Sequence, residues 1–155
     1  MMRSVQCLLL LLIISFPLSP HFATKLSAQE LQGRDEQLSF VGMRLADLFA
    51  RFGTPSTVFA ARGVESWQDD VVFQYPAGEF YVYRDRVWQV KLTSVCGVSL
   101  RDSRRVALLT LGDEVQDKGD HLLLPQTGAA WPLMLRVNLD NAGNVAAIYV
   151  YRSDY

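Results

Sequence analysis

The chain has 155 residues, of which 50% are hydrophobic and 20% are charged, and its formal net charge at pH 7 is −1. This apolar fraction excludes a disordered chain, and a charge near zero excludes a protein that holds nucleic acid mainly through phosphate contacts. Two cysteines are too few for a disulfide-rich scaffold, and the length is that of one domain.

Residues 1–28 have the pattern of a secretory signal peptide. A short basic start containing Arg3 precedes an unbroken apolar run, Cys7–Ile14, and a more polar stretch then ends at Ala28. The apolar core has roughly 12 residues, fewer than the ~20 that a membrane-spanning helix needs. We therefore expect cleavage after Ala28 and a periplasmic or secreted protein, with retention of the segment as an anchor as the alternative. Because Cys7 stands at the start of the apolar run and not after it, it cannot be the acylated cysteine of a lipoprotein.

Cleavage at this position changes the composition of the body that remains. The removed segment holds two basic and no acidic residues, so the exported body, Gln29–Tyr155, carries 13 basic and 16 acidic side chains, a net charge of −3. One cysteine, Cys96, is left, so an apolar core and not an internal disulfide must stabilise the fold. Cys96 lies among apolar neighbours, which favours a buried small hydrophobe over a reactive thiol.

The first half of the exported body reads as a helix followed by strands. Residues 29–39 are predicted to be a flexible lead-in, and residues 40–94 a first α+β repeat. Apolar residues at helical spacing predict a short helix over 43–52, which Gly53 and Pro55 end. Residues 56–70 lack an apolar period and are predicted to be mostly loop. Three segments rich in β-branched and aromatic residues are predicted to be strands, namely 71–75, 80–83 and 87–93.

Residues 95–155 are predicted to be a second α+β repeat on the same plan. Ser99 is the expected N-cap of a helix that runs to about Leu111, with Asp102 placed for the reciprocal contact. A polar loop is expected after this helix, over 113–120. Three strands are expected next, over 122–125, 131–139 and 145–152, and a turn at 140–144 joins the last two.

Corresponding residues of the two halves recur at a nearly constant offset in the sequence. The pairs Val87 and Val145, Val90 and Ile148, and Leu92 and Val150 share one offset in residue number, 58. The pairs Tyr81 and Val137, and Tyr83 and Leu139, share an offset of 56. This order with small insertions predicts a duplicated unit of about 55–60 residues.

A family resemblance rests on three short segments. A Gly42-Met43 start, a helix that ends in Phe-Gly-Thr-Pro (52–55) and the last turn followed by residues 143–148 resemble the small bacterial envelope domains typified by the outer-membrane assembly lipoprotein SmpA/OmlA. The β-lactamase-inhibitor protein shares that fold as two tandem units. The resemblance implies an α+β fold of two tandem helix-plus-antiparallel-hairpin units, with helices packed on one face of the sheet. It also implies a binding or scaffolding role outside the cytoplasm, without a cofactor. This chain departs from the lipoproteins in lacking the acylated cysteine.

Residues for catalysis or metal binding are few. His121 follows Asp120, but adjacent residues on a strand point to opposite faces, so we expect His121 to be a solvated or capping residue and name no catalytic residue. One histidine and one cysteine cannot make a zinc site. One acidic loop holds Glu65, Asp69 and Asp70, and a second holds Asp113, Glu114, Asp117 and Asp120. Both loops are predicted to be solvated turns and not calcium sites, so no metal ligand is named.

Aromatic side chains are the predicted binding residues. Strand alternation places Tyr81 with Tyr83, and Tyr149 with Tyr151, opposite the core-like residues. If both pairs lie on the sheet face without helices, they form a surface suited to a protein partner, and Trp67 is added to this set. The alternative is that the tyrosines only pack in the core or strengthen strand pairing. The same alternation puts Trp88 with Val90 and Leu92, and Ala146 with Ile148 and Val150, on the core-like faces.

The sequence therefore favours a non-enzymatic, exported bacterial protein that binds an envelope or periplasmic protein, with no nucleic acid, no membrane span after cleavage and no cofactor. The first alternative is a small-ligand or lipid-binding domain with an apolar pocket between helices and sheet. The second is an enzyme that uses His121.

Overall fold

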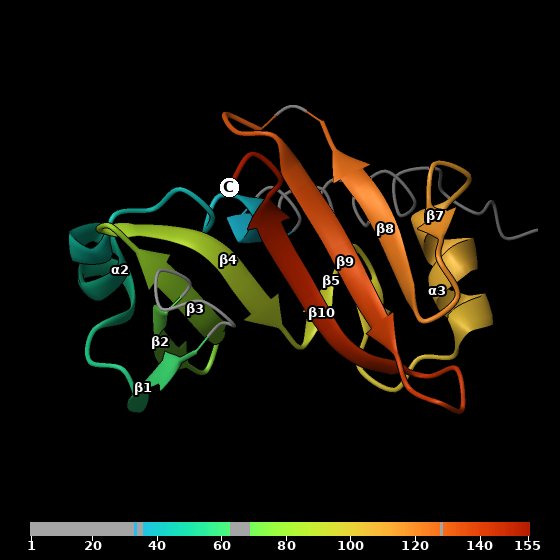
Figure 1. The fold of residues 1–155 in the computed structure, drawn as a ribbon, viewed down its shortest axis with the longest axis horizontal. Helices are drawn as coiled ribbons and strands as arrows, with labels where there is room; N and C mark the ends of the chain where they lie inside the picture. Colours follow the sequence, from blue (N-terminus) through green and yellow to red (C-terminus); the bar gives the residue numbers. More distant parts are fainter. Residues whose placement is uncertain (1–32, 34–35, 63–68, 128) are drawn as a thin grey trace, which may run out of the picture.

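The computed structural model describes residues 33, 36–62, 69–127 and 129–155. The expected signal peptide, Trp67 and Glu65 lie outside the described residues. The structure is an α+β fold with an eight-stranded antiparallel sheet in the order β1-β2-β3-β4-β10-β9-β8-β7 (Figure 1). The strands of this sheet are β1 Thr57–Ala61, β2 Asp70–Tyr75, β3 Gly78–Tyr83, β4 Arg86–Leu92, β7 Gln116–Asp117, β8 His121–Gln126, β9 Leu133–Leu139 and β10 Val145–Arg152. Two short strands, β5 (Ser94–Val95) and β6 (Val98–Ser99), form a separate pair.

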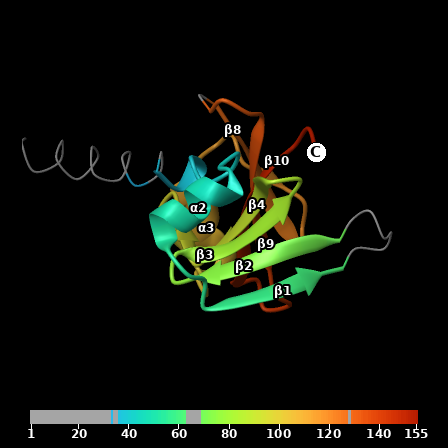
Figure 2. The same ribbon diagram turned by 90° about the vertical axis from the view of Figure 1, so that its left-hand side faces the viewer.

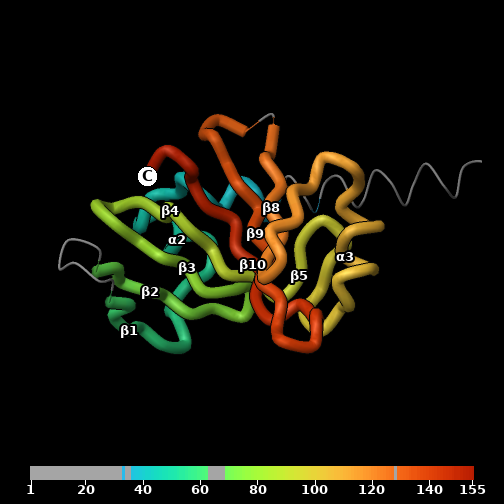
Figure 3. Tube along the Cα trace, turned by 45° about the vertical axis from the view of Figure 1, so that its right-hand side comes forward, coloured from blue at the N-terminus to red at the C-terminus, as the bar shows by residue number. Residues whose placement is uncertain are grey.

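Two eight-residue helices lie near opposite ends of the sheet (Figures 1 and 3). Helix α2 spans Leu45–Phe52 within the predicted range, and Gly53 ends it with a φ of 73°. Helix α3 spans Arg104–Leu111, and its N-cap is Ser103, whose side chain accepts a hydrogen bond from the Val106 amide. The predicted cap was wrong because Ser99 belongs to β6.

Neither edge strand of the sheet, β1 or β7, was predicted from the sequence. Strand β1 lies in the segment predicted to be loop, and β7 in the predicted polar loop. Four of the five residues of β1 are exposed, so the segment carries no alternating burial signal. Strand β7 has only two residues, both exposed. Edge strands pair on one side only, and such short or exposed segments resemble loops in sequence.

One face of the sheet forms the main core together with the helices. Leu48 of α2 and Ala107 of α3 are fully buried against alternating strand residues such as Phe80, Val90 and Ile148. In the side view, α2 lies over one face of the sheet (Figure 2). Residues 36–39, at the end of the expected flexible lead-in, are part of this layer, because Leu38 is buried in the core. We call the other side of the sheet the open face.

Two bulges change which side chains reach the open face. The register between β3 and β4 shifts beside Trp88, and the register between β9 and β10 shifts beside Ala146. A bulge adds one residue to a strand and so reverses the alternation on one side of it. Val87 is therefore fully buried, whereas Trp88 leaves the core-like face predicted for it and Ala146 is exposed.

The register contradicts two of the predicted correspondences between the halves. Phe80 faces Val90, and Val137 faces Ile148. Phe80 and Val137 are both fully buried, whereas Tyr81 lies on the opposite side of the sheet. The predicted matches of Tyr81 to Val137 and of Tyr83 to Leu139 were wrong, because each pairs an open-face residue with one that packs in or against the core.

The segments that lead into the two helices are tied to the sheet in the same way. The Gly42 amide donates to the Val87 carbonyl over 2.7 Å, and the Val87 amide donates to the Met43 carbonyl over 2.9 Å. In the second half, Arg101 donates to Val145 over 2.8 Å, and Val145 donates to Asp102 over 2.8 Å.

Candidate functional site

The open face is built from strand residues that alternate with the core residues. At one end of this face, Val72 is fully buried. Among the described residues, it is the one buried hydrophobic residue that does not belong to the main core cluster. Val72 faces Tyr81 on one side and Phe59 on the other. The open face thus has its own packed layer of large side chains, unlike a solvated sheet face that carries only polar groups.

The structure places all four predicted tyrosines on the open face. Tyr81 faces Gln89 of β4, and Gln89 in turn faces Tyr151 of β10. Tyr149 faces Lys91 across the β4–β10 junction, and Tyr83 lies at the end of β3. All four are half-buried, so each exposes part of its ring. Both pairs therefore lie on the face opposite the core, which is the condition set for the predicted surface. Their role in binding stays a prediction, and Trp67 lies outside the described residues.

A polar cluster occupies the middle of the open face. The Tyr81 hydroxyl donates to Glu79 Oε2 over 3.3 Å, and Lys91 Nζ lies 3.1 Å from Glu79 Oε1. Burial, followed by the negative charge of Glu79 and the proximity of Tyr149, raises the pKa of Tyr81 above its ordinary value. Tyr81 therefore remains a neutral hydrogen-bond donor, and Glu79 and Lys91 neutralise each other.

The β8–β9 side of the open face carries a different set of groups. Arg136 lies between Leu123 of β8 and Tyr149 of β10, and its Nε donates to Asn138 Oδ1 over 2.7 Å. Met134, which faces Tyr151, adds a half-buried apolar side chain.

An aromatic cluster closes one end of the open face. The ring of Tyr155 stacks on Trp88 at a centroid distance of 5.8 Å and meets Tyr83 edge-on at 5.7 Å. Arg152 lies 4.0 Å from the centroid of the Trp131 ring and 5.3 Å from that of Tyr155. These contacts bring the chain's last residues against the β3–β4 hairpin.

Trp88 also makes the polar contact that holds Asp70. Its indole Nε1 donates to Asp70 Oδ1 over 3.0 Å. Partial burial raises the pKa of Asp70, the hydrogen bond from Trp88 acts in the opposite direction, and the neighbouring charge of Asp69 raises it further.

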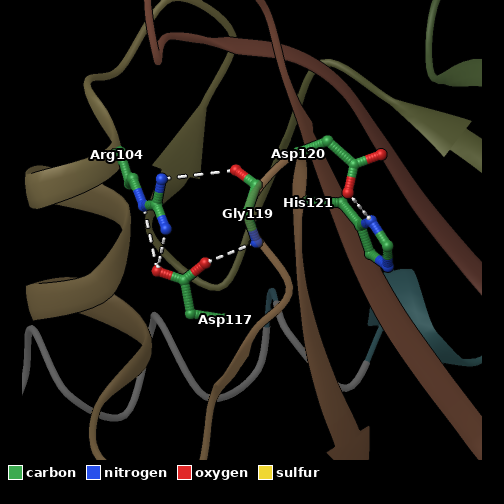
Figure 4. A network of polar contacts seen from close by, with 5 residues as sticks. All are labelled: Arg104, Asp117, Gly119, Asp120 and His121. Carbon is green, nitrogen blue, oxygen red and sulfur yellow. Dashed lines mark hydrogen bonds and ion pairs between the residues drawn. The ribbon is translucent and has the colours of Figure 1, made fainter.

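The acidic loop before β8 makes local contacts, which Figure 4 shows. Arg104 Nε donates to Asp117 Oδ2 over 2.9 Å, a terminal guanidinium nitrogen pairs with the same oxygen, and the Gly119 amide donates to Asp117 Oδ1 over 3.0 Å. The hydrogen bond from Arg104 lowers the pKa of Asp117. This carboxylate therefore fastens α3 to the edge of the sheet.

Asp120 and His121 contact each other, contrary to the prediction that they point apart. His121 Nδ1 lies 2.6 Å from Asp120 Oδ1, because Asp120 precedes the strand and is not held to its alternation (Figure 4). This hydrogen bond lowers the pKa of Asp120. Within the described ranges, no three histidine, cysteine or acidic side chains are grouped closely enough to hold a metal ion.

A surface groove lies outside the open face. It has a volume of about 740 Å³ and is formed where the segment before α2 meets the segment before β9. Its apolar lining includes Leu38, Val41, Met43, Trp131 and Leu133. The groove borders the buried core cluster, and the predicted pocket between helices and sheet stays a prediction.

Sequence reasoning missed Trp88, Arg136 and Tyr155 as members of the open face and its border. Trp88 was assigned to the wrong side because a bulge leaves no signal in the residue pattern. The position of Arg136 on the open face could have been predicted, because Arg136 alternates with the buried residues of β9 and a predicted hairpin joins β9 to β10. Tyr155 lies beyond the last strand, where alternation gives no orientation.

Comparisons with known proteins give a likeness of fold. No family model matches the sequence, and no curated protein matches it significantly. An extracellular protein from Bacillus anthracis that contains a SCP domain matches with a TM-score of 0.47 and 14% identity, over 76% of this chain and 45% of that one. A cysteine-rich secretory protein from Staphylococcus aureus matches with a TM-score of 0.46 and 12% identity, over 75% and 46%. The chain thus spans less than half the length of either structure.

These findings correct the family resemblance. The assignment to SmpA/OmlA-like or β-lactamase-inhibitor-like proteins was wrong, because no such family model matches and the matching structures are described as SCP-domain and cysteine-rich secretory proteins. The three segments behind it are turn and helix-end patterns that many folds share.

The matched proteins are described as extracellular and secretory. In the part of the chain that the structure describes, no helix has the length and apolar character needed to cross a membrane.

Proposed function

We propose that this chain is an exported, non-enzymatic protein whose open face binds a protein partner. The observation that carries the proposal is the placement of Tyr81, Tyr83, Tyr149 and Tyr151 on the sheet face opposite α2 and α3. Half-buried tyrosines hold a fixed orientation and still expose ring and hydroxyl, a combination enriched at protein interfaces. The signal-peptide pattern of residues 1–28 supports export.

The symmetry of the strand order supports the inference that the sheet consists of two similar units. The strand order reads β1 to β4 and then β10 to β7, so exchanging the two halves maps the order onto itself. Lys91 and Tyr149 face each other at the centre of this order. The separation in residue number between them equals the separation between the two bulge residues, Trp88 and Ala146. We infer two copies of one helix-plus-hairpin unit, which together make a wider open face than either could offer alone.

Paired substitutions on the two faces test the proposed function. Replacing Tyr149 and Tyr151 with alanine should leave the fold intact and weaken partner recovery from cells at least about tenfold, since interface tyrosines often contribute about 2 kcal/mol or more. Leu109→Ala, at an exposed position of α3, is the matched control and should change nothing. Equal recovery with the tyrosine variant and the wild-type chain would exclude the open face as the partner site.

The groove beside Trp131 favours a second candidate function, the binding of a small apolar ligand. Its volume of about 740 Å³ lies within the range of ligand sites, and its lining is mixed apolar and polar. Lipid extracted from the purified protein and identified by mass spectrometry, together with quenching of Trp131 fluorescence by a fatty acid, would support this function. Protein that carries no lipid and shows no quenching would dismiss it.

A further inference from the structure

Arg136 is a half-buried cation on the open face, and no described residue forms an ion pair with it. Its Nε is held by Asn138 over 2.7 Å, which fixes the plane of the guanidinium group. No carboxylate among the described residues lies within ion-pair distance of it, and its two terminal nitrogens donate to no described residue. Lys91, by contrast, already has Glu79.

Hydrogen-bonding groups without described partners lie next to Arg136. Tyr149 stands directly opposite it on β10, and Tyr151 lies two residues further on the same face. Neither tyrosine hydroxyl bonds to a described residue, whereas that of Tyr81 is engaged with Glu79. Opposite residues in an antiparallel pair are about 5 Å apart, so the guanidinium and these hydroxyls can approach one bound group.

The charge balance of the open face identifies the kind of group that fits. Glu79 and Lys91 cancel each other, and Asp70 is held by Trp88 at the far end. Asp120 is near enough for Arg136 to help lower its pKa, but it is engaged with His121. These hydrogen bonds leave the carboxylates of Asp70 and Asp120 charged, but neither carboxylate lies within ion-pair distance of Arg136. Arg136 is therefore a positive charge that no described carboxylate contacts directly, although the expected exported body carries a net −3.

A single guanidinium matches a single carboxylate in charge and in the geometry of its donors. A phosphate group carries about −1.5 to −2 and normally recruits further cations, which the neighbouring Leu123, Met134 and tyrosines do not supply. These apolar and aromatic neighbours suit the side chains that flank an acidic residue in a polypeptide.

We propose that Arg136 is the anchor of the partner site and binds a carboxylate of an acidic, partly apolar segment of a protein. This rests on the proposed function and adds to it the chemistry of the partner. Tyr149 and Tyr151 donate to the same carboxylate or pack beside it, and Asn138 is the positioning residue that orients the guanidinium.

Nuclear magnetic resonance titration of the full-length protein with capped hexapeptides tests the proposal. The first probe alternates glutamate with leucine, the second replaces glutamate by glutamine, and the third is inorganic phosphate. The glutamate peptide should shift the signals of β8, β9 and β10, including Arg136 Nε–H. It should bind about fivefold more tightly than the glutamine peptide, the order expected for one partly screened charge pair. Arg136→Gln should abolish that preference, and Arg105→Gln, at an exposed position of α3, should keep it.

The outcomes separate this proposal from the proposed function. Equal binding of the two peptides on the open face, or an unchanged preference in Arg136→Gln, would overturn the role of Arg136 and leave the open face as a binding surface. Tighter binding of phosphate than of the glutamate peptide would also overturn the carboxylate assignment. If neither peptide shifted any open-face signal, both proposals would fail.

Discussion

Lys91 and Tyr149 lie directly opposite each other where the two central strands of the sheet, β4 and β10, pair. The residues on either side of them on the core face, Val90 opposite Val150 and Leu92 opposite Ile148, are all buried. The halves of the chain therefore share one continuous sheet and one core. We expect them to unfold together.

Ile148→Ala tests this cooperativity. The side chain is fully buried, so its truncation should lower the free energy of unfolding by about 2–5 kcal/mol. Tyr149→Phe, at the next residue on the open face, should change it by less than about 0.5 kcal/mol. Chemical denaturation followed by far-ultraviolet circular dichroism and by tryptophan fluorescence should give coincident curves for both variants. Two separated transitions would contradict a shared core.

Gly42 and Trp131 form a second testable contact. Gly42 has a φ of 94°, and a Cβ on it would lie 2.2 Å from Trp131 Nε1. Gly42→Ala should therefore cost about 1–3 kcal/mol from overpacking in addition to the cost of its backbone conformation. Gly143→Ala is the matched control, because its φ is 78° and no atom would lie within 4 Å of the new Cβ.

A double variant isolates the steric part of this effect. Adding Trp131→Ala to Gly42→Ala should recover the overpacking cost, so the two substitutions should be coupled in a thermal-denaturation cycle. Additive effects of the two substitutions would show that the ring does not set the requirement for glycine.

Ser103, and not Ser99, should stabilise α3. Ser103→Ala removes the side-chain acceptor of the Val106 amide and should cost about 1 kcal/mol. Ser99→Ala should have almost no effect, because the contact with Asp102 uses the backbone amide of Ser99. The denaturation midpoints of the two variants check this order, and a larger loss in Ser99→Ala would reverse it.

Asp70→Asn should stabilise the protein at neutral pH. Burial raises the pKa of Asp70 above its ordinary value of 3.8, so the folded state binds this proton more tightly than the unfolded state does. Its contribution to stability is present below that value and is lost as the pH rises through the folded pKa. Asparagine does not titrate and still accepts a hydrogen bond from Trp88. The advantage of the variant should be absent near pH 3 and full at pH 7. A constant advantage across this range would contradict the pKa shift.

Residue pattern predicted the centre of the fold better than its edges. Strand β10 was predicted with its observed bounds because turn residues and β-branched side chains delimit it. Strand β1 was missed because its side chains are exposed and a single partner strand holds it. The tyrosine face followed from alternation, since β3 has no bulge and the bulge of β10 lies before Tyr149 and Tyr151.

The remaining parts of the candidate site depend on contacts between distant segments. Trp88 reaches the open face only because of a bulge, and the pairing of Asp120 with His121 depends on where β8 begins. That Arg136 has no described ion-pair partner could not be recognised from its own strand. It depends on which carboxylates the fold brings within ion-pair distance and on the pairing of Lys91 with Glu79 two strands away.

Site-specific photocrosslinking in cells shows directly whether the open face contacts a protein partner. A photoreactive phenylalanine derivative would replace Tyr151 on the open face in one full-length variant and Leu109 on α3 in the other. We expect a discrete crosslinked protein with the probe at position 151, its loss when Tyr149 is also changed to alanine, and no such product with the probe at position 109. Crosslinking only at position 109, or no discrete product at position 151, would contradict this expectation.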